Sequence, residues 1–192
     1  GRTAVLLGDV SGHGVPAALL SATARAYLRG SLLQGAGLDS AITMANTRIK
    51  EDTAEARFIV FIGAIFDANQ HRLDVTAAGH PGFLLRSSSA SFETINAKGI
   101  PLGIELESVF ETTVFDSIAD GDLLMLASDG AWETRNSAEE EFGIERVLKI
   151  VVDHRDQTPD QILGMLFNAI AQWHGPGSLE DDCTIVIAKI LG

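Results

Sequence analysis

The chain has 192 residues, 46% of them hydrophobic and 21% charged, a balance typical of one globular domain. Its 26 Asp and Glu against 14 Lys and Arg give a formal net charge of -12. A surface this acidic repels phosphate backbones and the sequence holds no basic patch, so the composition argues against nucleic-acid binding. No uninterrupted apolar run reaches the roughly 18 residues of a membrane span, and the single cysteine excludes an internal disulfide, so we expect a cytoplasmic protein with no membrane contact.

The first quarter of the chain predicts one strand and two helices. Residues 3–8 indicate a buried strand, and because a chain seldom opens in its core, we expect an N-terminally truncated fragment of a longer protein. A helix is predicted from near Val15 to 33, with Pro16 in its first position. Its surface is apolar almost throughout, which predicts a helix that is largely buried or paired with another. A second helix fits 38–51.

A block of consecutive strands follows, and then further helices. Apolar runs separated by turn-forming residues predict strands at 58–66, 72–78, 83–86, 92–95, 109–115 and 123–127. Residues 144–152 indicate a helix, and a capping box at 158–161 predicts the start of another. A last strand is expected at 183–191, with Cys183 as a small buried residue. Strands in a block with helices on either side indicate an α+β fold with mostly antiparallel sheet.

Three acidic positions share one local context, each at the end of a predicted strand beside a turn. They are Asp9, Asp129 and the pair Asp181-Asp182. If the three strands are neighbours, the carboxylates converge and need neutralisation, which a hard divalent cation such as Mg²⁺ or Mn²⁺ provides. The alternatives are raised pKa values or acids that do not meet, and a single Asp-Gly after a strand is usually only a turn.

Five stretches around these acids, in this order, resemble the metal-dependent serine/threonine phosphatases of the PPM (PP2C-like) family, in the bacterial branch typified by SpoIIE and RsbU. The stretches are Gly8–Gly14 with Pro16–Ala18, Ala78–Pro81, Gly99–Gly103, Gly121–Glu133 with Phe142–Gly143, and Glu180–Thr184. The resemblance implies a single domain over residues 1–192 with an α-β-β-α sandwich of two mostly antiparallel sheets flanked by helix pairs.

The resemblance also implies two Mn²⁺ or Mg²⁺ ions. Asp9 would bridge both metals, the Val10 carbonyl would help to hold one, and Asp129 and Asp181 would bind the other, which makes the three aspartates the expected catalytic residues. Asp182 and Gly130 would lie next to these ligands. The family carries another acidic motif on a strand before the one that ends at Asp9, so one contributor to the second metal site would lie outside the sequence.

Two metals of this kind would activate water for the hydrolysis of phosphoserine or phosphothreonine. The implied partners are a phosphoprotein substrate, an anti-sigma-factor antagonist in bacterial partner switching, and an upstream sensory or receiver domain. The helices at 15–33 and 38–51 would either cover the sheet or form a dimer or regulatory surface. Two histidines in the motifs, His13 and His80, are predicted to have structural roles, His13 through a hydrogen bond in its turn.

Two other functions remain open at this point. A catalytically silent PPM-like module would bind a partner or dimerise without turnover. A metal-dependent nuclease or phosphodiesterase would also use clustered aspartates, but the net charge of -12 argues against it.

Overall fold

The computed structural model describes residues 1–53, 57–177, 179 and 181–191. The chain divides into two compact units, unit 1 with Gly1–Pro81 and Ile95–Ile118, and unit 2 with Gly82–Thr94 and Ala119–Gly192. Four strands form a sheet in each of two groups, β1-β2-β3-β6 and β5-β4-β7-β8. The ladders that join β1 to β2, β2 to β3, β3 to β6, β4 to β7 and β7 to β8 are antiparallel. The predicted α+β class with two antiparallel sheets is confirmed.

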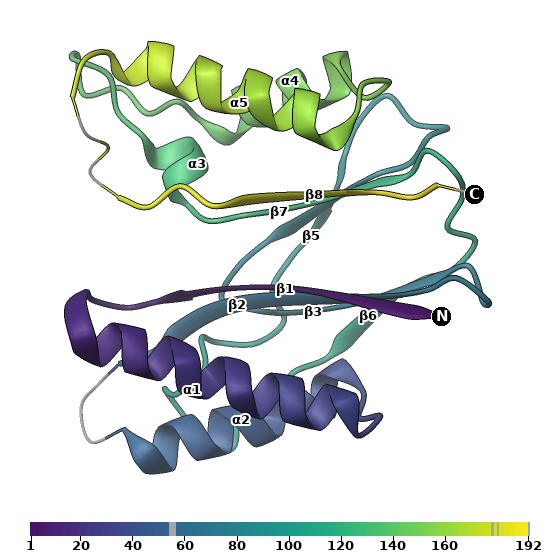
Figure 1. Cartoon of the computed structure of the whole chain (residues 1–192), viewed down its shortest axis with the longest axis vertical. Helices are drawn as coiled ribbons and strands as arrows, with labels where there is room; N and C mark the ends of the chain where they lie inside the picture. The colour runs from purple at the N-terminus through teal and green to yellow at the C-terminus, as the bar shows by residue number, and fades with distance from the viewer. Residues whose placement is uncertain (54–56, 178, 180, 192) are drawn as a thin grey trace. The chain divides into compact units, whose positions relative to one another are not determined.

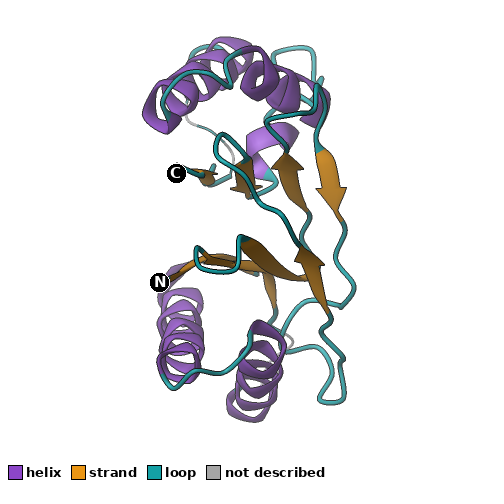
Figure 2. Ribbon diagram, turned by 90° about the vertical axis from the view of Figure 1, so that its right-hand side faces the viewer, coloured by secondary structure: helices purple, strands orange, loops and turns teal. Residues whose placement is uncertain are grey.

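Unit 1 places two helices on one face of its sheet (Figures 1 and 2). Its strands are β1 (Arg2–Val10), β2 (Ile59–Asp67), β3 (Arg72–Ala78) and β6 (Thr112–Phe115). Its helices are α1 (Gly14–Leu33) and α2 (Leu38–Asp52). The turn between β2 and β3 forms because the Asp67 carboxylate accepts hydrogen bonds from the backbone N–H groups of Asn69 and Gln70, at 3.0 and 3.2 Å.

The core of unit 1 lies between α2, the buried side of α1 and the sheet. The apolar side chains of α2 with zero exposure are Ala41, Ile42, Ala45 and Ile49. Their spacing of one, three and four residues gives the single apolar face that the sequence predicted for this helix. Leu102 and Phe110, from the loop before β6, fill the same cluster.

Helix α1 differs from the prediction in where it begins, and its burial decides between the two predicted arrangements. It begins at Gly14, so Pro16 stands in the third helical position; this is still the first turn, where N–H groups have no partner within the helix. Only one narrow side is buried, and Val15, Leu19 and Leu33 are exposed. The helix is therefore not largely buried but paired with α2, the other arrangement that the sequence left open.

Unit 2 covers its sheet with a second helix pair (Figure 1). Its strands, in order across the sheet, are β5 (Glu93–Ile95), β4 (Gly82–Leu85), β7 (Leu123–Ala127) and β8 (Ile185–Lys189). Its helices are α3 (Gly130–Glu133), α4 (Ile144–Asp153) and α5 (Pro159–His174). All five residues of β7 are buried, as its continuous apolar run predicted.

The ends of unit 2 show where the sequence predicted well and where it did not. The capping box is confirmed, because Thr158 Oγ1 accepts from the Gln161 N–H and Gln161 Oε1 accepts from the Thr158 N–H. Strand β8 is shorter than predicted and leaves Cys183 just outside it. Burial raises the pKa of the half-buried Cys183 thiol to about 11. Across the described residues, no helix is both long and apolar enough to cross a membrane.

Candidate functional site

The first acidic loop lies in unit 1, where β1 passes into α1. Asp9 is the second-last residue of β1 and stands opposite Val60, while Val10 ends the strand opposite Ile59. Gly12 and Gly14 then take φ angles of +88° and +77°. These left-handed conformations favour glycine and turn the chain abruptly into the helix.

A serine fastens this loop to the start of β2. The Ser11 N–H donates to the Phe58 carbonyl at 2.9 Å, and the Phe58 N–H donates to Ser11 Oγ at 2.9 Å. Gly12 lies beside the same segment, since a Cβ added there would be 3.1 Å from Arg57 Nη1. The loop that contains Asp9 is therefore positioned against residues 57–58 as well as by its own strand.

The two motif histidines have different environments. His13 is the exposed N-cap of α1, and its side chain makes no capping hydrogen bond, so the structural hydrogen bond predicted for it is wrong. Its backbone is extended, as is usual for the residue directly before a helix. His80 is only 4% exposed, which agrees with the packing role predicted for it.

The second acidic loop lies in unit 2, at the end of β7. Asp129 is the N-cap of the short helix α3, and its Oδ1 accepts from the Gly130 N–H at 2.9 Å. Helix α3 was not predicted, because a helix of four residues shows no periodicity. An N-cap aspartate after a buried strand was the available signal.

Strand pairing brings the third acidic position to the same edge of the sheet. Because β7 and β8 are antiparallel neighbours, the end of β7 meets the segment that leads into β8. The Ser128 N–H donates to the Thr184 carbonyl at 2.8 Å, and the Thr184 N–H donates to Ser128 Oγ at 2.9 Å. Ser128 Oγ also donates to the Asp182 carbonyl at 3.1 Å.

Close backbone packing fixes this edge further. A Cβ added at Gly130 would lie 2.5 Å from the Asp182 carbonyl oxygen, so only glycine fits. Asp181 Oδ1 accepts from the Asp182 N–H at 2.8 Å, which orients the Asp181 carboxylate along its own turn. Gly130 and Asp182, which the resemblance placed beside the ligands, thus contact one another through backbone atoms.

Electrostatics show that the acids of unit 2 act on one another. Burial raises the pKa of the Glu133 carboxyl above its ordinary value, and the negative charges of Asp129, Glu141 and Asp181 raise it further, while Arg135 opposes them. The repulsion means that negative charge accumulates at this edge of the sheet. A bound divalent cation would relieve it.

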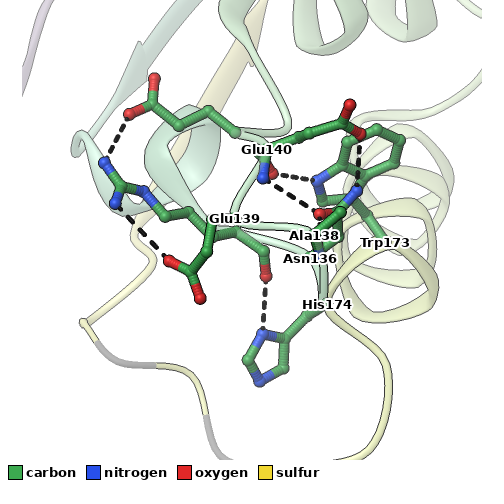
Figure 3. A network of polar contacts seen from close by, with 8 residues as sticks. Asn136, Ala138, Glu139, Glu140, Trp173 and His174 are labelled. Atoms are coloured by element: carbon green, nitrogen blue, oxygen red, sulfur yellow. Dashed lines mark hydrogen bonds and ion pairs between the residues drawn. The ribbon is translucent and has the colours of Figure 1, made fainter.

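A polar network holds the segment after α3 against α5 (Figure 3). Trp173 Nε1 donates to the Glu140 carbonyl at 3.0 Å, and His174 Nδ1 lies 3.1 Å from the Arg135 carbonyl. Arg135 forms ion pairs with Glu139 and Glu141, at 3.8 and 3.1 Å. The network fixes residues 135–141, which follow α3, and Asp129 lies at the other end of this short helix.

The structure brings some of the predicted residues together. Asp129 and Asp181 share one edge of unit 2, whereas Asp9 and Val10 belong to unit 1 and to the other sheet. Within the described part of the chain, no group of three or more His, Cys, Asp and Glu side chains has an arrangement that could hold a metal ion. The donors that are present, carboxylates and backbone carbonyls, are nevertheless the hard oxygen ligands that Mg²⁺ and Mn²⁺ prefer.

Comparison with known proteins identifies the family and the fold. The family model of Stage II sporulation protein E (SpoIIE) matches residues 1–191. The phosphoserine phosphatase RsbU of Bacillus subtilis is 27% identical over 190 residues, which are 96% of this chain and 55% of RsbU. The chain spans about half the length of the curated relatives it matches, 55% of RsbU and 45% of the phosphoserine phosphatase RsbP.

Solved structures show the same fold at low sequence identity. The SiaA-PP2C domain of Pseudomonas aeruginosa matches with a TM-score of 0.83 and 18% identity, over 98% of this chain and 80% of that one. The catalytic domain of the phosphatase PstP, solved with two manganese ions, has a TM-score of 0.71 and 18% identity over 98% and 88% of the two chains. RsbX, solved with magnesium, has a TM-score of 0.74 and 14% identity over 97% and 80%. The chain therefore belongs to the SpoIIE family and has the PP2C fold.

Proposed function

We propose that this chain is the catalytic domain of a metal-dependent protein serine/threonine phosphatase that hydrolyses phosphoserine or phosphothreonine. The observation that carries the proposal is the pairing of β7 with β8, which sets Asp129 and Asp181 at one edge of a sheet. The SpoIIE match over residues 1–191 and the similarity to two phosphoserine phosphatases support it.

In this proposal Asp9, the Val10 carbonyl, Asp129 and Asp181 would hold two Mn²⁺ or Mg²⁺ ions, and Asp9 would contribute to both. When bound, the cations would supply an activated water and neutralise charge on the phosphoryl oxygens. The contribution of the chain is to orient the ligands. Ser11 and Ser128 hold the two acidic loops in place, and Gly130 lets the Asp182 backbone approach. The PstP and RsbX structures, which contain manganese and magnesium, support the choice of ion.

The proposal extends to the substrate and the parent protein. We infer that the substrate is a small phosphorylated anti-sigma-factor antagonist, which the similarity to RsbU supports. We infer a cytoplasmic parent protein in which this domain follows a sensory or receiver domain, and in which α1 and α2 contribute to a homodimer.

The test is a metal-dependence assay on the parent protein and on this chain. Wild-type protein is stripped of metal and assayed with p-nitrophenyl phosphate and a panel of phosphoserine proteins that includes phosphorylated anti-sigma-factor antagonists. Hydrolysis that requires added Mn²⁺ or Mg²⁺ supports the proposal, and undiminished hydrolysis in EDTA contradicts it. If calorimetry finds no Mn²⁺ binding to the parent protein while it still binds a partner, the chain is the silent binding module instead.

A further inference from the structure

A loop in unit 1 is anchored at several points although it lies between two short strands. It consists of residues 99–110 (the 99–110 loop). The Gly79 N–H donates to the Gly99 carbonyl at 2.9 Å. Leu102 and Ile59 exchange two backbone hydrogen bonds, at 2.8 and 3.0 Å. The first part of the loop is thus joined to the start of β2 and to the residue that follows β3.

A buried amide anchors the middle of the 99–110 loop. Asn46 on α2 has no exposed surface, and its two side-chain groups are both used by the loop. Asn46 Oδ1 accepts from the Gly103 N–H at 2.8 Å, and Asn46 Nδ2 donates to the Glu105 carbonyl at 2.7 Å. Such a satisfied buried amide fixes the conformation of residues 103–105, since breaking either bond would leave a polar group unpaired in the core. Phe110, 3% exposed, anchors the far end.

Between these anchors, the loop presents apolar side chains to solvent. The exposed fractions are 39% for Ile100, 41% for Ile104, 51% for Leu106 and 70% for Val109. A single exposed apolar residue is ordinary, but four within ten residues of an anchored loop are not. The anchors hold these side chains outward, so a partner that covers them would pay little ordering entropy on binding.

The 99–110 loop is connected to the Asp9 loop through residues 57–59. Ile59 pairs with Leu102, and Phe58 pairs with Ser11, two residues after Asp9. A Cβ added at Gly103 would lie 3.0 Å from the Arg57 carbonyl, which shows how closely the segments pack. Phe58 itself is 37% exposed. Backbone contacts therefore link the 99–110 loop to the segment that fastens the first acidic loop.

We propose that the 99–110 loop, together with Phe58, is the docking surface for the protein part of the phosphorylated substrate. This inference rests on the proposed phosphatase function. Glu105 and Glu107 are exposed between the apolar residues, and neither forms a side-chain ion pair with any residue that the structure describes. The occupant is accordingly a protein with an apolar contact patch flanked by Lys or Arg. A second copy of this chain docked through the same loop is disfavoured, because its Glu105 and Glu107 would face the same two acids.

The test compares a protein substrate with a small one. Ile104→Ser/Leu106→Ser is assayed, with metal, on the phosphoserine protein that the wild type hydrolyses fastest in the panel and on p-nitrophenyl phosphate. The matched control is Phe167→Ser on α5, where the replaced side chain is also 41% exposed. We expect kcat/KM for the phosphoprotein to fall about tenfold in the double variant, through KM, with p-nitrophenyl phosphate hydrolysis unchanged. The control should match the wild type on both substrates.

A charge variant gives a second, independent measurement. Glu105→Lys/Glu107→Lys should weaken the phosphoprotein reaction and reverse its dependence on ionic strength, again without an effect on p-nitrophenyl phosphate. Unchanged kinetics with the phosphoprotein in both double variants would overturn the docking role, and so would equal losses on both substrates. A wild type inactive on every substrate would overturn the proposed function, and the inference with it.

Discussion

The two acidic loops, one in each unit, are fastened by the same device. In unit 1, Ser11 exchanges two hydrogen bonds with Phe58, and in unit 2, Ser128 exchanges two with Thr184. In both, the serine N–H and hydroxyl oxygen engage the carbonyl and N–H of a single residue on the neighbouring segment. A hydroxyl beside an acidic loop thus extends the sheet pairing by one step beyond the backbone ladder.

The surroundings of the two serines differ. Ser128 is 3% exposed and makes a third hydrogen bond to Asp182, and Gly130 beside it has no room for a Cβ. Ser11 is half-buried, and the nearest atom to Gly12 belongs to the flexible end of Arg57. Dense packing therefore holds the loop of unit 2, whereas left-handed glycines and one serine hold the loop of unit 1. Two acidic loops fastened by the same serine contact can therefore differ in their tolerance of substitution.

The largest effect should come from the acids themselves, and it should be equal in the two loops. Asp9→Ala and Asp129→Ala are each expected to lower kcat/KM for p-nitrophenyl phosphate at least about a thousandfold, because a lost ligand removes several kcal/mol of charge stabilisation. Asp182→Ala is the control, since the contacts described for Asp182 come from its backbone. Activity retained in Asp9→Ala alone would show that the two loops do not serve one reaction.

Substitution of the loop glycines should show the clearest difference between the two loops in the free energy of unfolding. Gly130→Ala forces a Cβ to within 2.5 Å of the Asp182 carbonyl, and rigid backbone must move, at a cost of about 1–3 kcal/mol. Gly12→Ala meets only a side-chain end at 3.1 Å, so its cost is the strain of φ +88°, about 1 kcal/mol. Urea unfolding measures both. A larger loss for Gly12→Ala would reverse the ranking of the loops.

The elements of the fold were predictable where a local pattern determines them. The apolar run of β7 and the capping box of α5 produced predictions close to the observed bounds. Helix α3 was not predictable from periodicity, because its four residues form around the Asp129 cap. The shorter β8 and the narrow buried side of α1 depend on neighbours that the sequence does not specify.

The residue types of the candidate site were predictable from the sequence, but the spatial proximity of these residues was not. Asp129 and Asp181 stood out as strand-end acids, yet their proximity depends on the pairing of β7 with β8, which joins residues far apart in the chain. Asn46 gave no signal at all. It sits on a predicted helix, and its partners Gly103 and Glu105 are 57 and 59 residues away. Hydrogen bonds of such long range leave no local pattern.

The serines allow a direct measurement of the difference between the two fastenings. Ser128 is buried, and Ser128→Ala leaves the part-buried Thr184 N–H and Asp182 carbonyl each without this partner, which should cost about 1–3 kcal/mol. Ser11→Ala removes one bond at a half-buried site and should cost about 0.5–1.5 kcal/mol. Urea midpoints at constant m-value provide the comparison. Equal losses would mean that burial does not distinguish the loops.

The smallest expected effect concerns pH, and it again separates the units. One buried polar anchor of unit 1 is the neutral amide of Asn46, whereas one of unit 2 is the carboxylate of Asp122. Burial alone would raise the pKa of Asp122, but hydrogen bonds from the Ser87 and Ala119 N–H groups and from Arg86 outweigh it and hold the pKa below its ordinary value of 3.8. A carboxyl with a lowered pKa stabilises the folded state above 3.8, and this stability is lost as the pH falls through the folded-state pKa.

Tryptophan fluorescence can detect this loss in unit 2, because Trp132 and Trp173 both lie there. The urea midpoint of the wild type should fall more steeply between about pH 5 and 3 than that of Asp122→Asn, whose amide does not titrate in this range. Asn46→Ala, which disturbs the anchor of unit 1, should lower the free energy of unfolding by the same amount at the two ends of this pH range. If Asp122→Asn keeps the full wild-type slope, other carboxylates account for the acid sensitivity, and the charged anchor of unit 2 is no more sensitive to acid than the amide of unit 1.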